Sequence, residues 1–473
     1  MVDGRELAAQ FENAADFETR KVLCGGQLLT VLFLDGLTSG GDIAEQVVRP
    51  LAQMTDEARE EVLYTRALQG GVWCASVKEP ESTQQAAELL VNGFCVILFP
   101  KSGKALDCEV KTGEKRSPSP PETENTVKGA KDAFTETLRT NTSLVRRHLR
   151  TPGLRLTETV IGKRTLTKVT VCWIDRLTDP ELPRRMQERL SSIDIDGALS
   201  PAAIEEYVTG SRRTAFPLLE YTERTDHFCQ GLLDGQVGLL ADGLPLGYLA
   251  PVGLGRLMRS PEDRATDFFS ASMLRLLRYA ALGVSLLLPA LYAAMAMFHQ
   301  QMLPTKLLLS IIESKQNVPF STLLEVLGLL CAFELLQQAG LHLPQAVGTA
   351  VSIIGGLVVG TAAVDAKLVS PAALIVTASS GICGFTLPNR ELSDAVRLWR
   401  FVLTVLAGLW GLFGVTVGLL LLLTELAGLE SLGRSYLSPF GRAEVKGALV
   451  RPRLVRQKWR DGALKPMDDQ NQR

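Results

Sequence analysis

Residues 279–298 read YAALGVSLLLPALYAAMAMF, twenty residues without a charged side chain. At about 1.5 Å of rise per residue, a helix of this length covers the roughly 30 Å hydrocarbon core of a bilayer. Before this stretch the chain is rich in charges, and after it the chain is mostly apolar to residue 429. The stretch therefore predicts the junction between a soluble half and a membrane half.

The charge balance supports this division. The whole chain of 473 residues has a formal net charge of -1, which argues against a nucleic-acid-binding protein. The first twenty residues, MVDGRELAAQFENAADFETR, contain no apolar core of the kind that a cleavable signal peptide has. We therefore expect the soluble half to stay in the cytoplasm. Residues 431–473 form a basic tail.

The soluble half contains an internal repeat. DFETRKVLCGGQLLTVLFLDGLT (16–38) parallels LTETVIGKRTLTKVTVCWIDRLT (156–178), and LLVNGFCVILF (89–99) parallels LLDGQVGLLAD (232–242). Both copies combine continuous apolar runs typical of buried strands with helical stretches in the order strand, helix, helix, strand. This order predicts two related α/β subdomains, with a chance likeness between ordinary α/β patterns as the alternative.

A polar stretch, KTGEKRSPSPPETENTVKGAK (111–131), separates the two copies and is expected to be a linker. A helical segment follows at 134–152, and it ends in the basic residues Arg146, Arg147, His148 and Arg150. These charges are interpreted either as a solvated face or as a surface for anionic lipid or an acidic partner.

No catalytic or metal-binding pattern is present. The chain lacks a phosphate-binding G-x-x-x-x-G-K-S/T, a G-x-S-x-G and an H-E-x-x-H. Its eight cysteines form no C-x-x-C and read as reduced, mostly buried side chains. Asp194 and Asp196 are interpreted as turn residues rather than as cation ligands. We therefore expect neither an enzyme nor a cofactor or metal.

Three polar or irregular residues stand out in the membrane half. Pro289 lies in the middle of the first span, where it frees a backbone carbonyl that a neighbouring helix or water has to satisfy. Glu325 and Glu334 lie in the apolar stretch 321–339, and a charge at the bilayer centre costs at least about 2.5–3.5 kcal/mol. Either protein or water surrounds this stretch, or it is an interfacial helix with both glutamates in water.

Small residues mark the later spans as tightly packed. Gly356 and Gly360 form a G-x-x-x-G pair, and Ser379 and Ser380 lie in the span 372–387. Small polar residues of this kind favour helix packing, with a polar path as the alternative. The last span, 401–427, carries a stripe of glycines: Gly408, Gly411, Gly414 and Gly418.

The side on which each loop lies is left open by the sequence. The expected loop 389–400 contains Arg390, Arg397 and Arg400, and the tail is more basic still. The positive-inside rule places both in the cytoplasm, which one straight span between them cannot achieve. Either the last segment folds back at its glycines, or one basic flank lies outside. We favour a cytoplasmic tail and a re-entrant or interfacial stretch at 321–339.

Residues 129–440 resemble the spore germination receptor A-subunit family, the GerA/SpoVAF family. The resemblance is carried, in order and spacing, by AFTETLRTNTSLVRRHLRTP (133–152), IDIDGALSPAAIEEYV (193–208), SPED (260–263), LRLLRYAALGVSLLLPALYAAMAMFHQQMLPTKLLLSI (274–311), VPF (318–320), AFELLQQAGLHLP (332–344), IIGGLVVGTAAV (353–364), VSPA (369–372) and YLSP (436–439). The first hundred residues match only weakly.

The resemblance implies a multi-pass subunit of a nutrient germinant receptor in the spore inner membrane, with a cytoplasmic N-terminal part. Its implied partners are a transporter-like B subunit, a lipoprotein C subunit, further copies of itself and the lipid bilayer. It implies an oligomer that conducts ions when a germinant is sensed. A non-conducting scaffold that recruits other germination proteins is the alternative, and a secondary transporter is weaker because no inverted repeat is found.

The expected fold class is an α/β cytoplasmic part with two related subdomains, an all-α membrane domain of about four to five hydrophobic spans, and a basic tail. The expected domains are an α/β subdomain at 1–110, a linker at 111–132, a basic helix with a second subdomain at 133–270, a transmembrane domain at 271–430 and the tail at 431–473. The candidate functional or packing residues are Pro289, Glu325, Glu334, Gly356, Gly360, Ser379, Ser380, Gly411 and Gly414.

Overall fold

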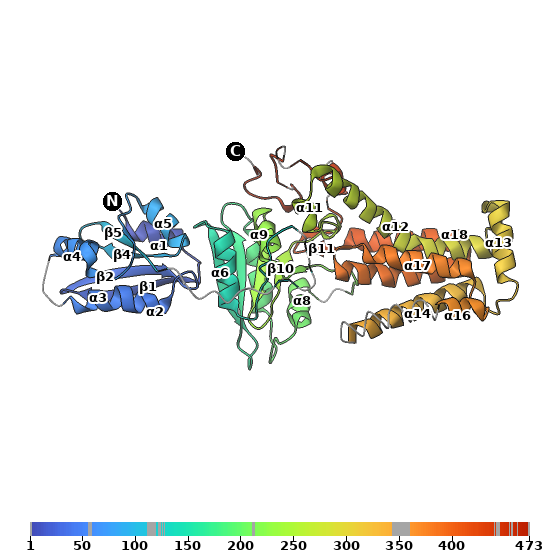
Figure 1. The fold of residues 1–473 in the computed structure, drawn as a ribbon, viewed down its shortest axis with the longest axis horizontal. Coiled ribbons are helices and arrows are strands. Elements are labelled where there is room, and N and C mark those ends of the chain that lie inside the picture. The colour runs from blue at the N-terminus through green and yellow to red at the C-terminus, as the bar shows by residue number, and fades with distance from the viewer. Residues whose placement is uncertain are drawn as a thin grey trace.

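The computed structural model places two α/β units and a helical bundle in a row (Figure 1). It describes residues 2–54, 59–110, 120, 121, 124, 126, 128–210, 213–342, 360–438, 440, 445–453, 455, 457–460 and 462–471. The charged half of the sequence forms the two units, and the apolar half forms the bundle. The fold class expected from the sequence is confirmed. Residues 111–119 of the expected linker lie outside the described residues.

The two units are built on sheets of the same topology. The first sheet has the order β1-β2-β4-β5-β3 and the second the order β6-β7-β9-β10-β8, with every named pair antiparallel. The strands are β1 (Phe17–Cys24), β2 (Gln27–Leu34), β3 (Val77–Lys78), β4 (Phe94–Phe99), β5 (Lys104–Glu109), β6 (Leu154–Ile161), β7 (Thr167–Ile174), β8 (Glu220–Thr222), β9 (Val237–Ala241) and β10 (Gly247–Ala250).

This shared order confirms the duplication. β2 and β7 occupy matching places in the two paired stretches 16–38 and 156–178, and β4 and β9 begin at matching places in 89–99 and 232–242. The central strand β4 is buried along its whole length, as its continuous apolar run FCVILF predicts. Chance similarity would not reproduce the spatial order of five strands.

Helices cover the sheets. The first unit has α1 (Gly4–Gln10), α2 (Gly40–Ile43), η1 (Ala44–Val48), α3 (Arg49–Gln53), α4 (Glu60–Arg66), η2 (Ala67–Gly71) and α5 (Thr83–Val91). The second has α6 (Leu138–His148), α7 (Glu181–Ser191), α8 (Pro201–Thr209) and α9 (Thr225–Leu233). Local sequence sets several of their starts: Ser82 accepts a hydrogen bond from the Gln85 amide at the start of α5, and Pro201 opens α8.

A buried ion pair joins the two units. The Arg146 guanidinium on α6 donates from Nε and Nη2 to the carboxylate of Asp16 at 2.7 and 2.8 Å. Both side chains are almost fully buried. His148, also at the basic end of α6, lies 2.7 Å from Asp132. Part of this basic end therefore makes contacts within the protein. At Arg146, neither the solvated face nor the lipid surface considered from the sequence is correct.

The long helices of the bundle run between a base at the second unit and a distal end; they are α12 (Phe268–Met297), α14 (Thr322–His342), α17 (Pro371–Phe385) and α18 (Arg390–Gly428). The shorter α13 (Thr305–Lys315), α16 (Gly360–Asp365) and η3 (Gln300–Met302) lie toward the distal end (Figure 1). Within the described part of the chain, three helices are long and apolar enough to cross a membrane: Phe268–Met297, Thr322–Gly340 and Arg390–Gly428.

The last of these helices folds back on itself. Gly411 interrupts α18 with φ +61° and ψ -141°, a conformation that only glycine adopts readily. A Cβ atom added at Gly414 would overlap the carbonyl of Leu406, and one at Gly418 would overlap the Leu403 side chain. Residues so far apart along a straight helix cannot touch, so 390–410 and 412–428 are antiparallel arms. The interpretation in which the segment folds back at its glycines is thus supported by the structure.

The structure differs from the sequence-based expectations at two places. The expected loop 389–400 forms the first three turns of α18, where the Asn389 side chain caps the helix by accepting from the Leu392 amide. The expected interfacial or re-entrant stretch at 321–339 forms the continuous helix α14, whose length and composition suffice for a crossing. In both cases polar side chains find partners inside the bundle, which local hydropathy does not reveal.

Two short helices and the tail connect the bundle to the second unit. α10 (Leu254–Leu257) and α11 (Glu262–Ala265) lead into α12. After α18 the chain forms a small hairpin, β11 (Glu430–Ser431) and β12 (Arg434–Ser435), followed by α19 (Val445–Leu449) and η6 (Gly462–Leu464). The Ser431 hydroxyl donates to the Leu218 carbonyl and accepts from the Val252 amide. The start of the tail is therefore on the same side as the soluble units.

Candidate functional site

The centre of the bundle contains a chain of polar groups that begins at Pro289. Proline has no amide hydrogen, so the Ser285 carbonyl one turn earlier in α12 loses its helical partner. The Ser380 hydroxyl of α17 donates to that carbonyl at 2.7 Å. The requirement predicted from Pro289 is thus met by a neighbouring helix. Ser379 is only half-buried, and the hydrogen bond to Ser285 comes from Ser380.

The chain continues to a buried arginine. Arg400 Nη1 on the first arm of α18 donates to the Ser380 hydroxyl oxygen at 3.2 Å. The Arg400 side chain is 1% exposed, and its Nε and Nη2 have no hydrogen-bond partner among the described residues. The Ser285 hydroxyl is also buried without a partner. A guanidinium in this position is costly to bury, and such costs are tolerated mainly at functional sites.

A second arginine on the same helix pairs with Glu334. Arg397 Nη1 lies 2.9 Å from Glu334 Oε1 and donates to Gln337 Oε1 at 2.6 Å. Arg397 also contacts Asp394 one turn earlier. Glu334 is therefore neutralised by α18 and does not face lipid as an isolated charge. The Glu334 side chain keeps 30% of its surface exposed, so protein covers it on the side of α18.

Glu325 belongs to a separate cluster nearer the distal end. It is 1% exposed, and its Oε2 accepts hydrogen bonds from the Ser370 amide at 3.1 Å and the Ser370 hydroxyl at 2.8 Å. The Lys315 amine lies 3.4 Å from Oε1. Ser370 is the capping residue of α17, so Glu325 ties α14 to the start of α17 and to the end of α13. The two glutamates thus lie in different polar clusters.

Those glycines selected from the sequence that the structure describes lie at close contacts between helices of the same polypeptide. Gly360 faces Leu374, a Cβ at Gly411 would lie 2.7 Å from the His299 ring, and Gly414 packs on the opposite arm of α18. Gly356 lies outside the described residues. The sequence predicts that the glycine stripe is a packing face. In the structure, helices of the same chain pack against this face. It therefore does not provide a free surface for oligomer contacts.

Ion pairs hold the first turns of α12 to the short helix α11 that precedes it. The buried carboxylate of Asp263, in the sequence SPED, lies 3.2 Å from Arg275 Nη2 and 2.8 Å from Arg278 Nη1. Arg275 also donates to the Gly447 carbonyl in the tail at 3.2 Å. These contacts connect α11, α12 and the tail at one point. A rotation of α12 would break buried charge pairs, so movement at its base is coupled to the soluble part.

A second ion cluster joins the same short helices to the sheet of the second unit. Glu220 on β8 lies 2.9 Å from His227 Nε2 and 2.8 Å from Arg256 Nε, and Arg256 Nη1 lies 2.9 Å from Asp234. Burial alone would raise the pKa of Glu220, but Arg256 and His227 together lower it to about 2. Glu220 is therefore charged at neutral pH, and its ion pair with Arg256 holds α10 against the sheet.

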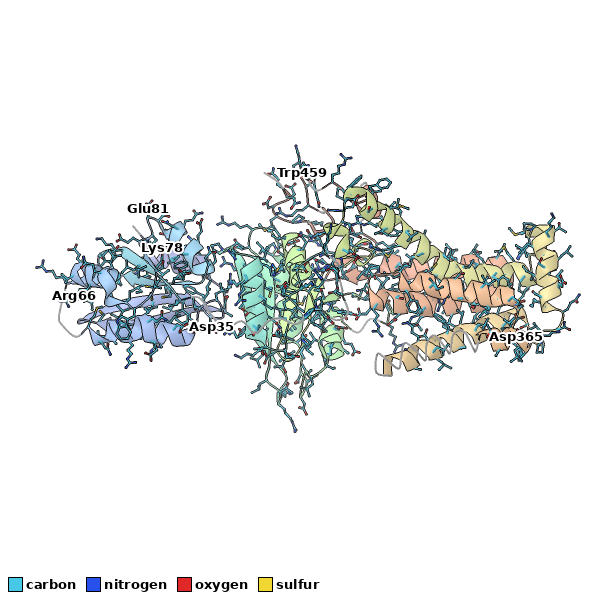
Figure 2. The ribbon with its side chains drawn as sticks, in the orientation of Figure 1. Asp35, Arg66, Lys78, Glu81, Asp365 and Trp459 are labelled. Atoms are coloured by element: carbon cyan, nitrogen blue, oxygen red, sulfur yellow. The ribbon has the colours of Figure 1, made fainter. Side chains whose placement is uncertain are left out.

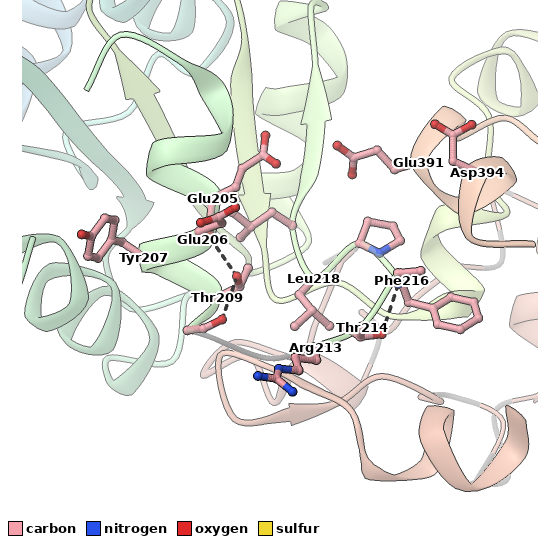
Figure 3. A pocket seen from close by; sticks show the side chains of 14 residues that line it. Glu205, Glu206, Tyr207, Thr209, Arg213, Thr214, Phe216, Leu218, Glu391 and Asp394 are labelled. Atoms are coloured by element: carbon pink, nitrogen blue, oxygen red, sulfur yellow. Dashed lines mark hydrogen bonds between the residues drawn. The ribbon is translucent and has the colours of Figure 1, made fainter. Parts of the chain in front are cut away.

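An acidic cleft of about 860 Å³ opens between the second unit and the bundle. Figure 3 shows Glu205 and Glu206 on α8 and, across the cleft, Glu391 and Asp394 on α18. Burial raises the pKa of Glu205, and the neighbouring Glu206 adds to the rise. In the described part of the chain, no three His, Cys, Asp or Glu side chains converge as metal ligands do. The acidic side chains of the second unit and those of the bundle therefore face each other across the cleft. The helices α10, α11 and α12 join the same two parts elsewhere.

Sequence reasoning found Pro289, Ser380, Glu325 and Glu334 but missed Arg400. It assigned Arg400 to a loop as a topology-determining charge. The signal that points to its true place is the position of Arg397 and Arg400 directly before an apolar run with no proline or glycine between them. Such a pattern is compatible with a helix that begins before Arg397 and continues without a break into the apolar run.

The chain is similar in sequence to several known proteins. The family described as Bacillus/Clostridium GerA spore germination protein matches residues 5–466. The chain is 36% identical to the uncharacterized membrane protein YfkQ of Bacillus subtilis (strain 168), covering 92% of this chain and 84% of that protein. It is 34% identical to the spore germination protein KA of Bacillus subtilis (strain 168), covering 94% and 83%.

Two further comparisons are similar in kind. The spore germination protein GerLA of Bacillus cereus is 31% identical over 93% of this chain and 90% of its own. A solved structure of the N-terminal domain of the A subunit of the Bacillus megaterium spore germinant receptor GerK3 is 23% identical, with a TM-score of 0.41. It covers 52% of this chain and 92% of that chain.

Proposed function

Since the chain belongs to the GerA family of Bacillus/Clostridium spore germination proteins, we propose that it is a membrane subunit of a nutrient germinant receptor. In this proposal it resides in the spore inner membrane with its two α/β units in the cytoplasm. It acts with a transporter-like B subunit and a lipoprotein C subunit, and several copies form an ion-conducting assembly. Its own role is to convert germinant binding elsewhere in the complex into a change of the membrane bundle.

One observation carries the mechanism: α12 connects two polar sites, one at the base of the bundle and one in its middle. Its base is held by Asp263 through Arg275 and Arg278, and its middle is held by Ser380 through the Ser285 carbonyl. Pro289 lies one turn after Ser285, and the helix bends most easily in the turn between them, because the missing hydrogen bond lowers the cost of bending there. Displacement of the second unit at α10 and α11 is therefore transmitted to Ser380 and Arg400.

The same geometry favours an ion path between copies over a path inside one copy. The buried Arg400 places a positive charge in the middle of the bundle, and the surrounding helices close tightly around it. A positive charge in a low-dielectric core repels cations over several ångströms. A path between copies would be opened or closed by movement of the helices that Arg400 and Ser380 hold together.

The test is ligand-dependent ion flux in liposomes that contain the chain with its B and C partners. Ser380→Ala removes the donor to the freed carbonyl and is expected to reduce the flux about ten-fold, from about 1–3 kcal/mol for a buried unsatisfied group. Glu334→Gln and Glu325→Gln test the two carboxylate clusters. Ser310→Ala is the matched control, since its exposed hydroxyl bonds only within α13. Absence of flux in the unmodified complex would refute conduction.

A non-conducting scaffold is the second candidate, and one feature of the soluble units favours it. The two equivalent hairpins expose apolar side chains at their tips: Leu23 and Leu28 in β1–β2, and Val160 and Leu166 near the end of β6–β7. Exposed apolar tips at matching places suit docking of other proteins. If the unmodified complex shows no ligand-dependent flux, and changing Leu28 and Leu166 to Ser abolishes germination at unchanged protein levels, the non-conducting scaffold is supported. Normal germination of this variant would contradict it.

A further inference from the structure

In the first three turns of α12, charged side chains face the protein and apolar side chains face outward, which is the reverse of the arrangement in a soluble helix. Their arginines, Arg275 and Arg278, point into the protein and pair with Asp263. Their outer face is apolar, with Phe269 73%, Met273 63% and Leu277 55% exposed. A continuous apolar face of this kind is seldom left in water, so something covers it.

The length of the helix shows where this face lies. α12 has 30 residues, which is about 45 Å at 1.5 Å per residue, against a hydrocarbon core of roughly 30 Å. The uncharged run 279–298 accounts for the core, so the first three turns extend beyond it. Figure 1 shows these turns leaving the bundle at a slant, at the end that faces the second unit. Their apolar face continues the lipid-facing surface of the same helix.

The neighbouring part of the tail is basic and apolar together. The Arg453 guanidinium lies 5.3 Å from the ring centre of Phe268 at the start of α12. Exposed side chains follow it along the tail, among them Val455 at 86%, Lys458, and Trp459 at 59%. Figure 2 shows Trp459 on the same flank of the molecule as the start of α12. Basic residues beside Trp and apolar side chains are typical of surfaces that contact anionic lipid headgroups.

From these observations we propose that the start of α12 and the tail residues Arg453, Val455, Lys458 and Trp459 form a docking surface for the anionic leaflet of the bilayer. The apolar face of the first three turns lies at the boundary between headgroups and acyl chains, and Arg453 and Lys458 bind lipid phosphates. Because Arg275 contacts both Asp263 and the Gly447 carbonyl of the tail, lipid bound here bears directly on the base of α12. The inference depends on the membrane helices and not on ion conduction.

The experiment uses the full chain in nanodiscs of phosphatidylcholine mixed with phosphatidylglycerol. A benzophenone-bearing phenylalanine analogue is placed at Phe269, at Phe413 as a control in the span, or at Leu199 as an exposed control on the second unit. After illumination, mass spectrometry identifies the adducts. We expect lipid adducts at 269 and 413 and none at 199. A chain-to-chain adduct at 269, or no lipid adduct there while 413 reacts, would overturn the proposal.

The preference for anionic lipid is measured in the same way. In Arg453→Glu with Lys458→Glu, the ratio of phosphatidylglycerol to phosphatidylcholine adducts at 269 is expected to fall about five-fold per charge removed, from about 1 kcal/mol per basic residue near an anionic surface. Lys163→Glu with Arg164→Glu, on the exposed turn after β6, is the matched control. An unchanged ratio in the tail variant would overturn the assignment of phosphate binding to these two residues.

Discussion

At the scale of single residues, buried polar groups explain much of the architecture. Ser380 replaces the amide that Pro289 lacks, and it receives a hydrogen bond from Arg400. Arg146 donates from Nε and Nη2 to both carboxylate oxygens of Asp16 at the contact between the two α/β units. In each case a long-range partner completes a group that its own helix or loop leaves unsatisfied, so these pairs also fix how neighbouring elements are oriented.

Asp107 is a buried residue without such a partner. Neither of its carboxylate oxygens on β5 has a hydrogen-bond partner among the described residues. Burial raises its pKa to about 8, although the charge of Lys78 opposes the rise. Its pKa in the unfolded chain is about 4, so the folded form holds a proton that the unfolded form has lost between these values. The stability of the first unit therefore falls as the pH rises from about 4 to about 8.

We expect Asp107→Asn to stabilise the first unit, and to do so most above about pH 8, because the amide needs no proton to stay neutral. Over the interval below that, the stability of the unmodified protein falls by up to about 1.4 kcal/mol per pH unit. Proteolysis of the first unit in the full chain, measured at several pH values, gives the comparison. Glu18→Gln on β1, an exposed position, is the control. Equal gains at low and high pH would contradict the assignment.

At the scale of elements, α18 is the helix that departs most from its linear appearance. Its glycines permit a reversal at Gly411 and the close approach of the two arms. Because the second arm packs against the first, the glycine stripe is covered by its own chain. A tight helical hairpin of this kind depends on small residues, since larger side chains would separate the backbones.

Gly414→Ala is expected to destabilise the bundle, because its Cβ would overlap the Leu406 carbonyl, and overpacking costs about 1–3 kcal/mol. The measurement is the fraction of monodisperse protein after heating in detergent. Gly283→Ala on α12 is the matched control, since a Cβ there meets no atom within 4 Å. The control is expected to be neutral or stabilising by up to about 1 kcal/mol, from helix propensity. Similar behaviour of both variants would contradict the hairpin.

At the scale of the whole molecule, the hairpin determines which parts share a side of the membrane. The start of α18 and the tail both lie near the second unit, whereas Gly411 and His299 meet at the distal end. The basic flanks 390–400 and 431–473 can therefore lie on one side, as the positive-inside rule requires. The acidic cleft and the two ion clusters are gathered at the same base.

Cysteine labelling tests this arrangement. One cysteine at a time, at Arg390, Met302 or Lys465, is introduced in a chain in which Cys331 and the half-buried Cys74 and Cys383 are replaced by Ala, so that the other native cysteines are buried. In sealed vesicles, a membrane-impermeant maleimide is expected to label positions 390 and 465 from one side and position 302 from the other. A straight α18 would instead place 390 and 465 on opposite sides. Labelling of all three after solubilisation confirms that each cysteine is reactive.

The sequence by itself determined the features that depend on local composition and periodicity. The run at 279–298 predicted the boundary between the soluble and apolar halves, and the repeated stretches predicted two related α/β subdomains. Pro289 specified that a carbonyl needs an outside donor, because the loss of an amide is a property of the residue itself. The apolar and glycine-rich segments likewise specified close packing, but without a partner.

Only the tertiary structure decided which groups meet. It identified Ser380 and Arg400 as the groups at the freed carbonyl, moved Arg400 from an expected loop into the core, and turned α18 back at Gly411. The physical reason is that a helical or small-residue pattern defines a face but not what covers that face. The covering surface comes from residues distant in the chain, and the cost of unpaired buried groups selects among the possible partners.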